Sequence, residues 1–197
     1  MLYCCTIDVV ERILPFTEVK YPLVRQRLLE LMKSDQIDRS KPWNINLDMT
    51  ESEWSKLMEP DWARAREMLL LLEQIRVPSA HNIGLDGSRA IWIIALHNID
   101  YQGAGEVVLK KMRYLFYKDK TQVFYPGIPY LFDRLCMSKN NWEQKSRQSY
   151  GTQGYVDSNG AHCRFPISQP SKLRERRLRY GLNTTDEECE HSHVRAT

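Results

Sequence analysis

The sequence predicts a mainly α fold, a single-domain helical bundle that carries one β-hairpin near residues 147–167. Apolar residues recur at helical spacing with charges between them, as Leu28, Leu31 and Met32 do. Residues 90–96 are apolar on every side, which is typical of a helix at the centre of a bundle. The pair Asn159-Gly160 lies between two segments of strand composition and is a strong hairpin signal.

The first half of the chain predicts three helices, over residues 18–38, 50–60 and 61–76. Thr50 and Glu53 have the spacing of a capping box, so they should open the second helix, and Pro60 should end it. Val77-Pro78 should stop the third helix. Residues 1–17 are expected to be a short lead-in, and residues 39–49 a loop.

The second half predicts four helices, over residues 85–98, 103–118, 128–137 and 172–180. A strand is the competing interpretation of the first, but its apolar run lacks alternation, and Asp86 and Ser88 are suitable caps. Gly181 is placed to end the last helix. The amphipathic helix 103–118 should turn five side chains inward: Val107, Val108, Met112, Leu115 and Phe116.

The hairpin is expected to pair residues 147–156 with residues 161–167 through a two-residue turn. Gly151 weakens the first strand and marks a bulge or the close approach of a ligand. This strand should form part of a pocket wall. Its alternation places Gln148, Tyr150 and Thr152 on one face and Gln153 on the other.

Length, charge and cysteine usage limit the classes of protein. The 197 residues suffice for one substantial core, with predicted bounds of 1–20 for an extension, 21–188 for the domain and 189–197 for a tail. A formal net charge of +3 provides no strong field, so we expect no nucleic-acid partner. The longest apolar run has seven residues, against about 20 for a membrane helix, so we expect no membrane partner. Five irregularly spaced cysteines and an N-terminus without a basic signal region predict a cytoplasmic protein.

His97 is the first candidate catalytic residue, because it extends the apolar stripe of residues 90–94 and a partly buried imidazole needs a partner. Asp100 could supply that partner. Asp35 and Arg39, at i and i+4, extend another apolar stripe, with the Gln36 amide beside them. A structural histidine and a surface ion pair are the alternative interpretations.

Asp133 and Arg134 border the apolar face of the helix predicted over residues 128–137. Burying either charge alone would cost several kcal/mol, so pairing is expected. The polar row of the hairpin suits recognition of a polar ligand and contains Gln148, Tyr150, Thr152 and Gln153. The alternatives are a structural salt bridge for the pair and a solvated edge strand for the row.

The order of these motifs resembles an uncharacterised, largely bacterial family recorded as a domain of unknown function. The matching pieces are Asp35-Gln36 with Arg39, His97 with Asp100, Asp133-Arg134, residues 148–153 and residues 176–182. Leu96 stands where the family usually has Gln. The resemblance spans residues 23–188 and implies a set of polar positions, with no activity attached.

Two hypotheses follow for the function. The first is a cofactor-independent enzyme, a hydrolase or lyase, that acts on a small polar or anionic molecule. His97 would be the acid/base, Asp35 or Asp133 would orient it or act as a second carboxylate, and the other polar residues would bind substrate: Arg39, Arg134, Gln36, Gln148, Tyr150, Thr152 and Gln153. A metal held by His97, Asp35 and Asp133 is a further option. The second hypothesis is a non-catalytic ligand- or protein-binding module in which the same groups form a structural network. The oligomeric state is left open.

Overall fold

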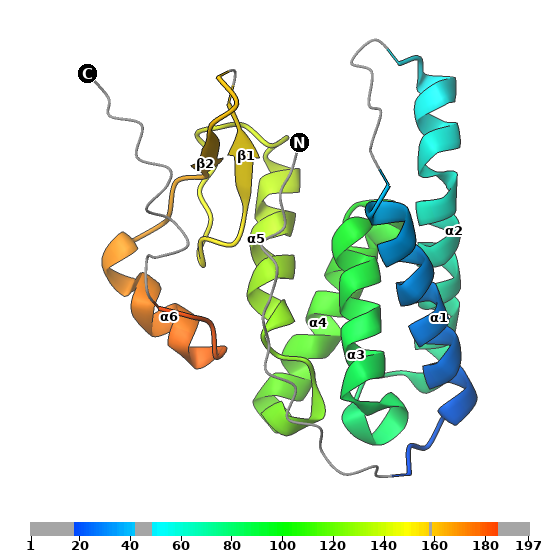
Figure 1. Ribbon diagram of the computed structural model, residues 1–197. Helices are drawn as coiled ribbons and strands as arrows, with labels where there is room; N and C mark the ends of the chain where they lie inside the picture. The colour runs from blue at the N-terminus through cyan, green and yellow to red at the C-terminus, as the bar shows by residue number, and fades with distance from the viewer. Residues whose placement is uncertain (1–17, 42–48, 158, 185–197) are drawn as a thin grey trace. The chain divides into compact units, whose positions relative to one another are not determined.

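The computed structural model describes residues 18–41, 49–157 and 159–184, and it is mainly α-helical with one small antiparallel hairpin (Figure 1). This confirms the predicted fold class. The described residues divide into two compact units, the helical unit (residues 18–125) and the C-terminal unit (residues 126–184), and each is described by itself. The domain bounds 21–188 stay a prediction, and the predicted lead-in 1–17 and tail 189–197 lie outside the described residues.

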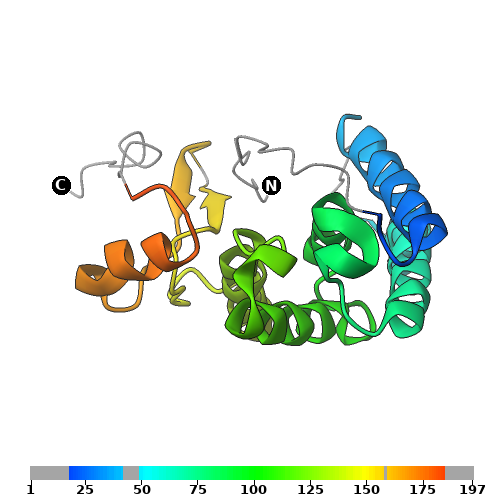
Figure 2. The ribbon, with the colours of Figure 1, turned by 90° about the horizontal axis from the view of Figure 1, so that it is seen from below.

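The helical unit contains α1 (Pro22–Arg39), α2 (Glu51–Ile75), α3 (Ala80–His97) and α4 (Ala104–Lys118), with the 3-10 turns η1 (Tyr101–Gly103) and η2 (Lys120–Gln122). Helix α3 packs against α1, α2 and α4, and it lies between α4 and α1 when the unit is seen from below (Figure 2). Ile91, Ile94 and Leu96 are fully buried. The apolar run therefore forms the central helix, as predicted, and the strand interpretation is wrong.

Helix α2 begins as predicted but does not end at Pro60. The capping box is present, because the Glu53 amide donates to Thr50 Oγ1 at 3.3 Å and the Thr50 amide donates to the Glu53 carboxylate at 2.8 Å. The helix then continues through Pro60 to Ile75. A proline removes one backbone hydrogen bond, and the buried side chains that follow, including Met68 and Leu72, hold the helix against the core.

Helix α3 begins at Ala80, five residues before the predicted start. Ser79 Oγ caps it by accepting from the Asn82 amide at 3.2 Å, and Gly84 interrupts the helix with φ +76. The predicted caps have other roles, since Asp86 pairs with Arg25 and Ser88 Oγ accepts from the Phe124 amide.

Helix α4 buries a narrower stripe than predicted. Val108, Met112 and Leu115 are buried, but Val107 is 39% exposed and Phe116 is half-buried. The buried stripe instead includes Leu109, because residues 108, 109, 112 and 115 share one helical face.

The C-terminal unit contains α5 (Gly127–Lys139), β1 (Gly154–Val156), β2 (His162–Arg164), η3 (Pro170–Lys172) and α6 (Leu173–Arg179). Helix α6 ends as predicted. Gly181 adopts φ +66, and its amide donates to the Leu178 carbonyl oxygen.

The hairpin is shorter than predicted, and its turn has a different length. Strand pairing covers three residues on each side, with Tyr155 opposite Cys163. The Asp157 amide donates to the Ala161 carbonyl oxygen at 2.9 Å, so three residues form the loop instead of two, and Gly160 adopts φ +79. Residues 148–153 do not continue β1, because the amides of Ser149, Tyr150 and Thr152 donate to a side chain of α5 described below. Gln148 forms an isolated bridge to Ile167.

Candidate functional site

A buried carboxylate and a histidine face each other in the helical unit. Asp35 lies in the last turns of α1, and its side chain is completely buried. His97 ends α3, and its Nδ1 lies 2.8 and 3.0 Å from the two carboxylate oxygens of Asp35. Because a carboxylate only accepts hydrogen bonds, Nδ1 carries the proton in this arrangement. His97 therefore has Asp35 as its partner, not Asp100.

Nε2 is the ring nitrogen of His97 that faces away from this contact. The His97 side chain is 12% exposed. Nε2 makes no hydrogen bond with the described residues. With the proton on Nδ1, Nε2 is the ring nitrogen that can accept one.

Two neighbours on α1 complete the surroundings of the Asp35 carboxylate. Gln36 donates to it from Nε2 at 2.8 Å, and Arg39 Nε lies 3.7 Å away. Burial acts to raise the pKa of Asp35, but the hydrogen bond from His97 and the charges of His97 and Arg39 outweigh it, so the pKa is lowered. The carboxylate is therefore ionised at neutral pH although water does not reach it.

The ion pairs continue from Arg39 into α2. Arg39 Nη2 donates to Asp61 at 2.5 Å, and the same carboxylate accepts from Arg64. Arg64 also donates to Asp38 at 2.6 Å. Burial opposes the charge of Arg64, but its hydrogen bonds to Asp38 and Asp61 raise its pKa above the ordinary value. The sequence analysis did not single out Asp61 and Arg64, although their i, i+3 spacing at the start of the buried face of α2 was a signal.

In the C-terminal unit, the carboxylate of Asp133 organises the stretch between α5 and β1. Its side chain is fully buried and accepts from the amides of Ser149 at 2.8 Å, Tyr150 at 3.1 Å and Thr152 at 3.1 Å. The Thr152 hydroxyl donates to it as well, at 3.0 Å. Burial raises the pKa of Asp133, while these donors act in the opposite direction. Both of its oxygens are engaged, which favours a structural role.

The side chains of the predicted polar row also make hydrogen bonds within the C-terminal unit. Gln148 donates from Nε2 to the carbonyl oxygens of Gln153 and Phe165, and its own oxygen accepts from the Gln153 amide. The Gln153 side chain donates to the backbone and hydroxyl oxygens of Thr152. All three side chains are buried, so the contacts favour the structural interpretation over a solvated edge strand.

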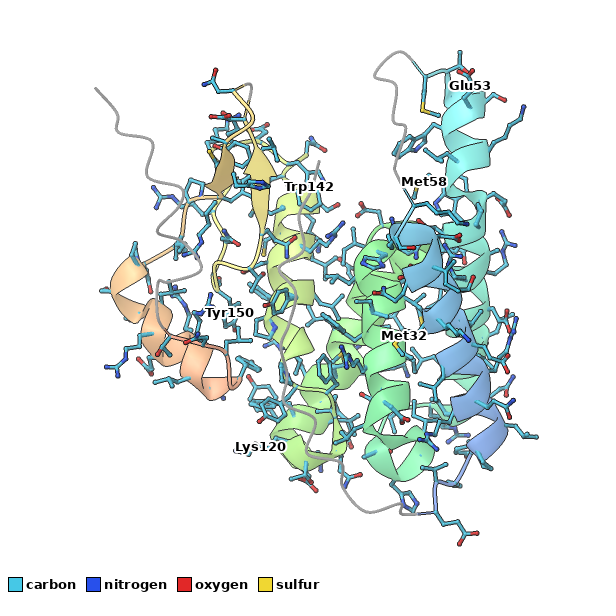
Figure 3. The ribbon with its side chains drawn as sticks, in the orientation of Figure 1. Met32, Glu53, Met58, Lys120, Trp142 and Tyr150 are labelled. Carbon is cyan, nitrogen blue, oxygen red and sulfur yellow. The ribbon has the colours of Figure 1, made fainter. Side chains whose placement is uncertain are left out.

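Tyr150 and Arg134 contact other side chains of the C-terminal unit. The Tyr150 ring lies edge-on to Phe132 and Tyr180, at centroid distances of 5.7 and 5.5 Å. The Arg134 guanidinium lies 5.6 Å from the Trp142 ring centroid. Figure 3 shows Trp142 and Tyr150 on the segment that links α5 to β1.

Arg177 was not identified by the sequence analysis as a site residue. It is buried in α6 and donates to the Tyr150 and Asn183 carbonyl oxygens. Its position within a basic run concealed this role.

The predicted site residues thus form two groups, one in each unit. Asp35, Gln36, Arg39 and His97 meet in the helical unit, and the others meet around Asp133 in the C-terminal unit. The convergence of the two groups on one cavity stays a prediction. An open depression of about 440 Å³ lies on α1, and its lining contains none of the predicted site residues: it consists of Pro22, Arg25, Gln26, Leu29, Glu30 and Lys33.

No family model, curated protein or solved structure gives a significant match to this chain. The resemblance to an uncharacterised bacterial family therefore stays an expectation from the sequence. Across residues 18–41, 49–157 and 159–184, no helix is long and apolar enough to cross a membrane. The same part of the chain contains no group of three or more His, Cys, Asp or Glu arranged to hold a metal ion.

Proposed function

We propose that this chain is an enzyme of the hydrolase or lyase type, with His97 as the acid/base group and Asp35 as the residue that orients it. The observation that supports the proposal is the contact of His97 Nδ1 with the buried Asp35 carboxylate. This contact leaves Nε2 as a proton acceptor, and the carboxylate stabilises the imidazolium that forms when Nε2 takes a proton. Asp35 is itself buried and holds its partner, so it acts as a positioning residue.

The substrate class we propose is a small polar or anionic molecule. Arg39 is 25% exposed and lies beside the pair, held by Asp61 on one side and Asp35 on the other. A guanidinium in this place adds positive charge beside the Asp35–His97 pair, where an anionic group on a substrate would be stabilised.

An activity screen with chromogenic carboxylic and phosphoric esters tests the proposal. We expect His97→Gln to lower the turnover of any substrate found by about 10²–10⁴-fold, the usual contribution of a positioned acid/base. Asp35→Asn should lower it as well, because it no longer fixes the protonated nitrogen. His81→Gln is the matched control, since it changes an exposed histidine of the same helix. Equal activity of the His97 and His81 variants would overturn the proposal.

Diethyl pyrocarbonate provides a measurement that needs no substrate. It acylates an accessible, unprotonated imidazole nitrogen, so Nε2 of His97 should react and should be found by peptide mass spectrometry. A His97 that stays unmodified while His81 reacts would show that Nε2 is inaccessible and would contradict the proposed role.

The non-catalytic binding module remains the second candidate, and the enclosed Asp133 carboxylate favours it. Its donors are all internal, as expected of a structural network. The two candidates differ in the effect of His97→Gln on turnover: the enzyme predicts a loss, and the binding module predicts no turnover to lose. Both predict a lower melting temperature for His97→Ala, because the buried Asp35 carboxylate loses a hydrogen-bond partner.

A further inference from the structure

Helix α2 continues past the helices that pack against it. Helix α1 ends at Arg39, whose guanidinium donates to Asp61 of α2, and α3 ends at His97, which contacts α1 at Asp35. Residues 51–60 therefore project beyond the ends of both neighbours (Figure 1). At 1.5 Å per residue, this projecting segment is about 15 Å long.

The projecting segment exposes apolar side chains. Trp54 and Leu57 are 42% and 39% exposed, and Met58 is half-buried. All three share one helical face with the buried Asp61 and Met68, so they continue the buried stripe of α2 beyond its neighbours. Figure 3 shows Met58 and the nearby Glu53 on this segment.

The projecting segment is also acidic. It contains three Glu and one Lys, a net charge of −2. By helical spacing, Glu51 and Glu53 flank the apolar stripe, one on each side, whereas Lys56 lies on the opposite side of the helix. We call this surface the acidic face: Glu51, Glu53, Trp54, Leu57 and Met58.

Helix α4 presents a surface of the opposite charge. The side opposite its buried stripe carries Tyr114 and Tyr117, both more than half exposed, together with the exposed Val107. The helix contains four Lys and Arg and one Glu, a net charge of +3. Lys118 Nζ lies 5.8 Å from the Tyr114 ring centroid. We call this surface the basic face: Val107, Lys110, Arg113, Tyr114, Tyr117 and Lys118.

We propose that the acidic face of one copy of this chain binds the basic face of a second copy, and that the two copies exchange this contact to form a dimer. The two faces have opposite charges, and each carries exposed apolar or aromatic side chains of the kind that stabilise protein interfaces. A reciprocal exchange closes the assembly at two copies, whereas a one-way contact would continue into an open chain.

A second copy accounts for both faces at once. They belong to the same compact unit, and each is exposed in it, so the two faces of one copy do not cover each other. A polyanion would cover the basic face alone and would leave the apolar side chains of α2 in water. Two contacts of this length form a small interface, so we expect a dissociation constant of about 10 µM.

Sedimentation velocity of the full chain over a range of concentrations tests the proposal. We expect a monomer–dimer equilibrium that weakens as the salt concentration increases, because salt screens the opposite charges. E51K/E53Q makes the projecting segment positive and keeps the capping box, in which Gln can replace Glu. K110E/R113E makes α4 negative. Each variant then has two faces of the same sign and should dimerise at least tenfold more weakly.

Mixing these two variants provides the decisive measurement. In an equimolar mixture, opposite charges meet at both contacts, so we expect a dimer at concentrations where each variant alone is monomeric. K20E/K33E is the matched control, because it reverses two exposed cations of the same unit and changes the net charge as K110E/R113E does. It should dimerise as the parent chain does.

The apolar part of the contact has its own pair of variants. Trp54→Ala should weaken the dimer, whereas Leu70→Ala, at an exposed position on the other side of α2, should not. Circular dichroism should show that all variants keep the helical content of the parent chain. A parent chain that stays monomeric, assemblies that grow beyond two copies, a mixture that stays monomeric, or an equal loss in K20E/K33E would each overturn the proposal.

Discussion

Replacing Asp133 by Asn should open the stretch 148–153 of the C-terminal unit. The substitution keeps the shape of the side chain but removes its charge, and it places an NH₂ group where one carboxylate oxygen was. Each oxygen of Asp133 now accepts from at least two donors, the amides of Ser149 and Tyr150 on Oδ1 and the amide and hydroxyl of Thr152 on Oδ2. In either orientation of the new amide, donors therefore face donors.

The size of the effect follows from these contacts. A hydrogen bond to a charged acceptor contributes about 1.5–3 kcal/mol, and such contributions are not additive within one cluster. Two lost bonds and one unfavourable donor pair correspond to about 3–5 kcal/mol of local stability. The local opening equilibrium should then increase by about 10²–10⁴-fold.

Amide hydrogen exchange measured by mass spectrometry reads this quantity directly. Peptides that cover residues 147–156 should exchange faster in Asp133→Asn by the same factor. Glu175→Gln is the matched control, because it removes an exposed carboxylate from the same unit and should leave this exchange unchanged. An acceleration of less than tenfold would show that the carboxylate does not hold the stretch in place.

Three further substitutions test the helical unit. The pKa of Asp35 is lower in the folded chain than in the unfolded chain, so its ionised carboxylate stabilises the fold at pH values above the pKa of the unfolded state. The difference in unfolding free energy between the parent chain and Asp35→Asn should therefore be largest near neutral pH. It should decrease below about pH 4, as measured by urea unfolding at each pH. Arg64→Met removes one of the two arginine partners of the buried Asp61 carboxylate and should cost about 1.5–3 kcal/mol in urea unfolding, against at most about 0.5 kcal/mol for the exposed Arg66→Met. Gly105→Ala should lower the melting temperature by an amount equivalent to about 1–3 kcal/mol, since its Cβ would stand 2.8 Å from the Ile99 carbonyl oxygen; an unchanged melting temperature would contradict that contact.

Local signals in the sequence were reliable wherever the deciding contacts lie within one turn. The capping box of Thr50 and Glu53 and the left-handed Gly181 both require only residues three or four apart. Pro60 also acts locally, but its single lost hydrogen bond is small beside the packing of the residues that follow it. The length of α2 is therefore set by contacts that no local pattern contains.

The strand predicted over residues 147–156 is wrong in its first part for a related reason. Residues 148–153 have the composition of a strand, and their amides need acceptors of some kind. The Asp133 carboxylate, sixteen or more residues earlier in the chain, accepts from those of Ser149, Tyr150 and Thr152, so the backbone curves around Asp133 and the strand pairing with β2 begins at Gly154. The sequence indicated that Asp133 and this stretch matter, but it could not show that one binds the backbone of the other.

The candidate site was predictable in part. The apolar stripes of two separate segments placed Asp35 and His97 at buried helix faces, and the sequence left open whether Asp35 or Asp133 would orient the histidine. The 2.8 Å contact with Nδ1 gives Asp35 that position. Asp61 and Arg64 complete the ion pairs from a third helix, and helix packing of that kind is not encoded in spacing alone.

Asp35 and Asp133, two of the buried aspartates, differ in what their partners can do. Every donor to Asp133 is a backbone amide or a hydroxyl, groups that neither gain nor lose a proton near neutral pH. The main donor to Asp35 is a histidine, a side chain type that changes its charge between pH 5 and 8, and its second nitrogen makes no hydrogen bond with the described residues. A proton can thus enter and leave the Asp35–His97 pair without breaking the contact that orients it. None of the donors to Asp133 among the described residues is such a group, which is why the acid/base proposal rests on the helical unit.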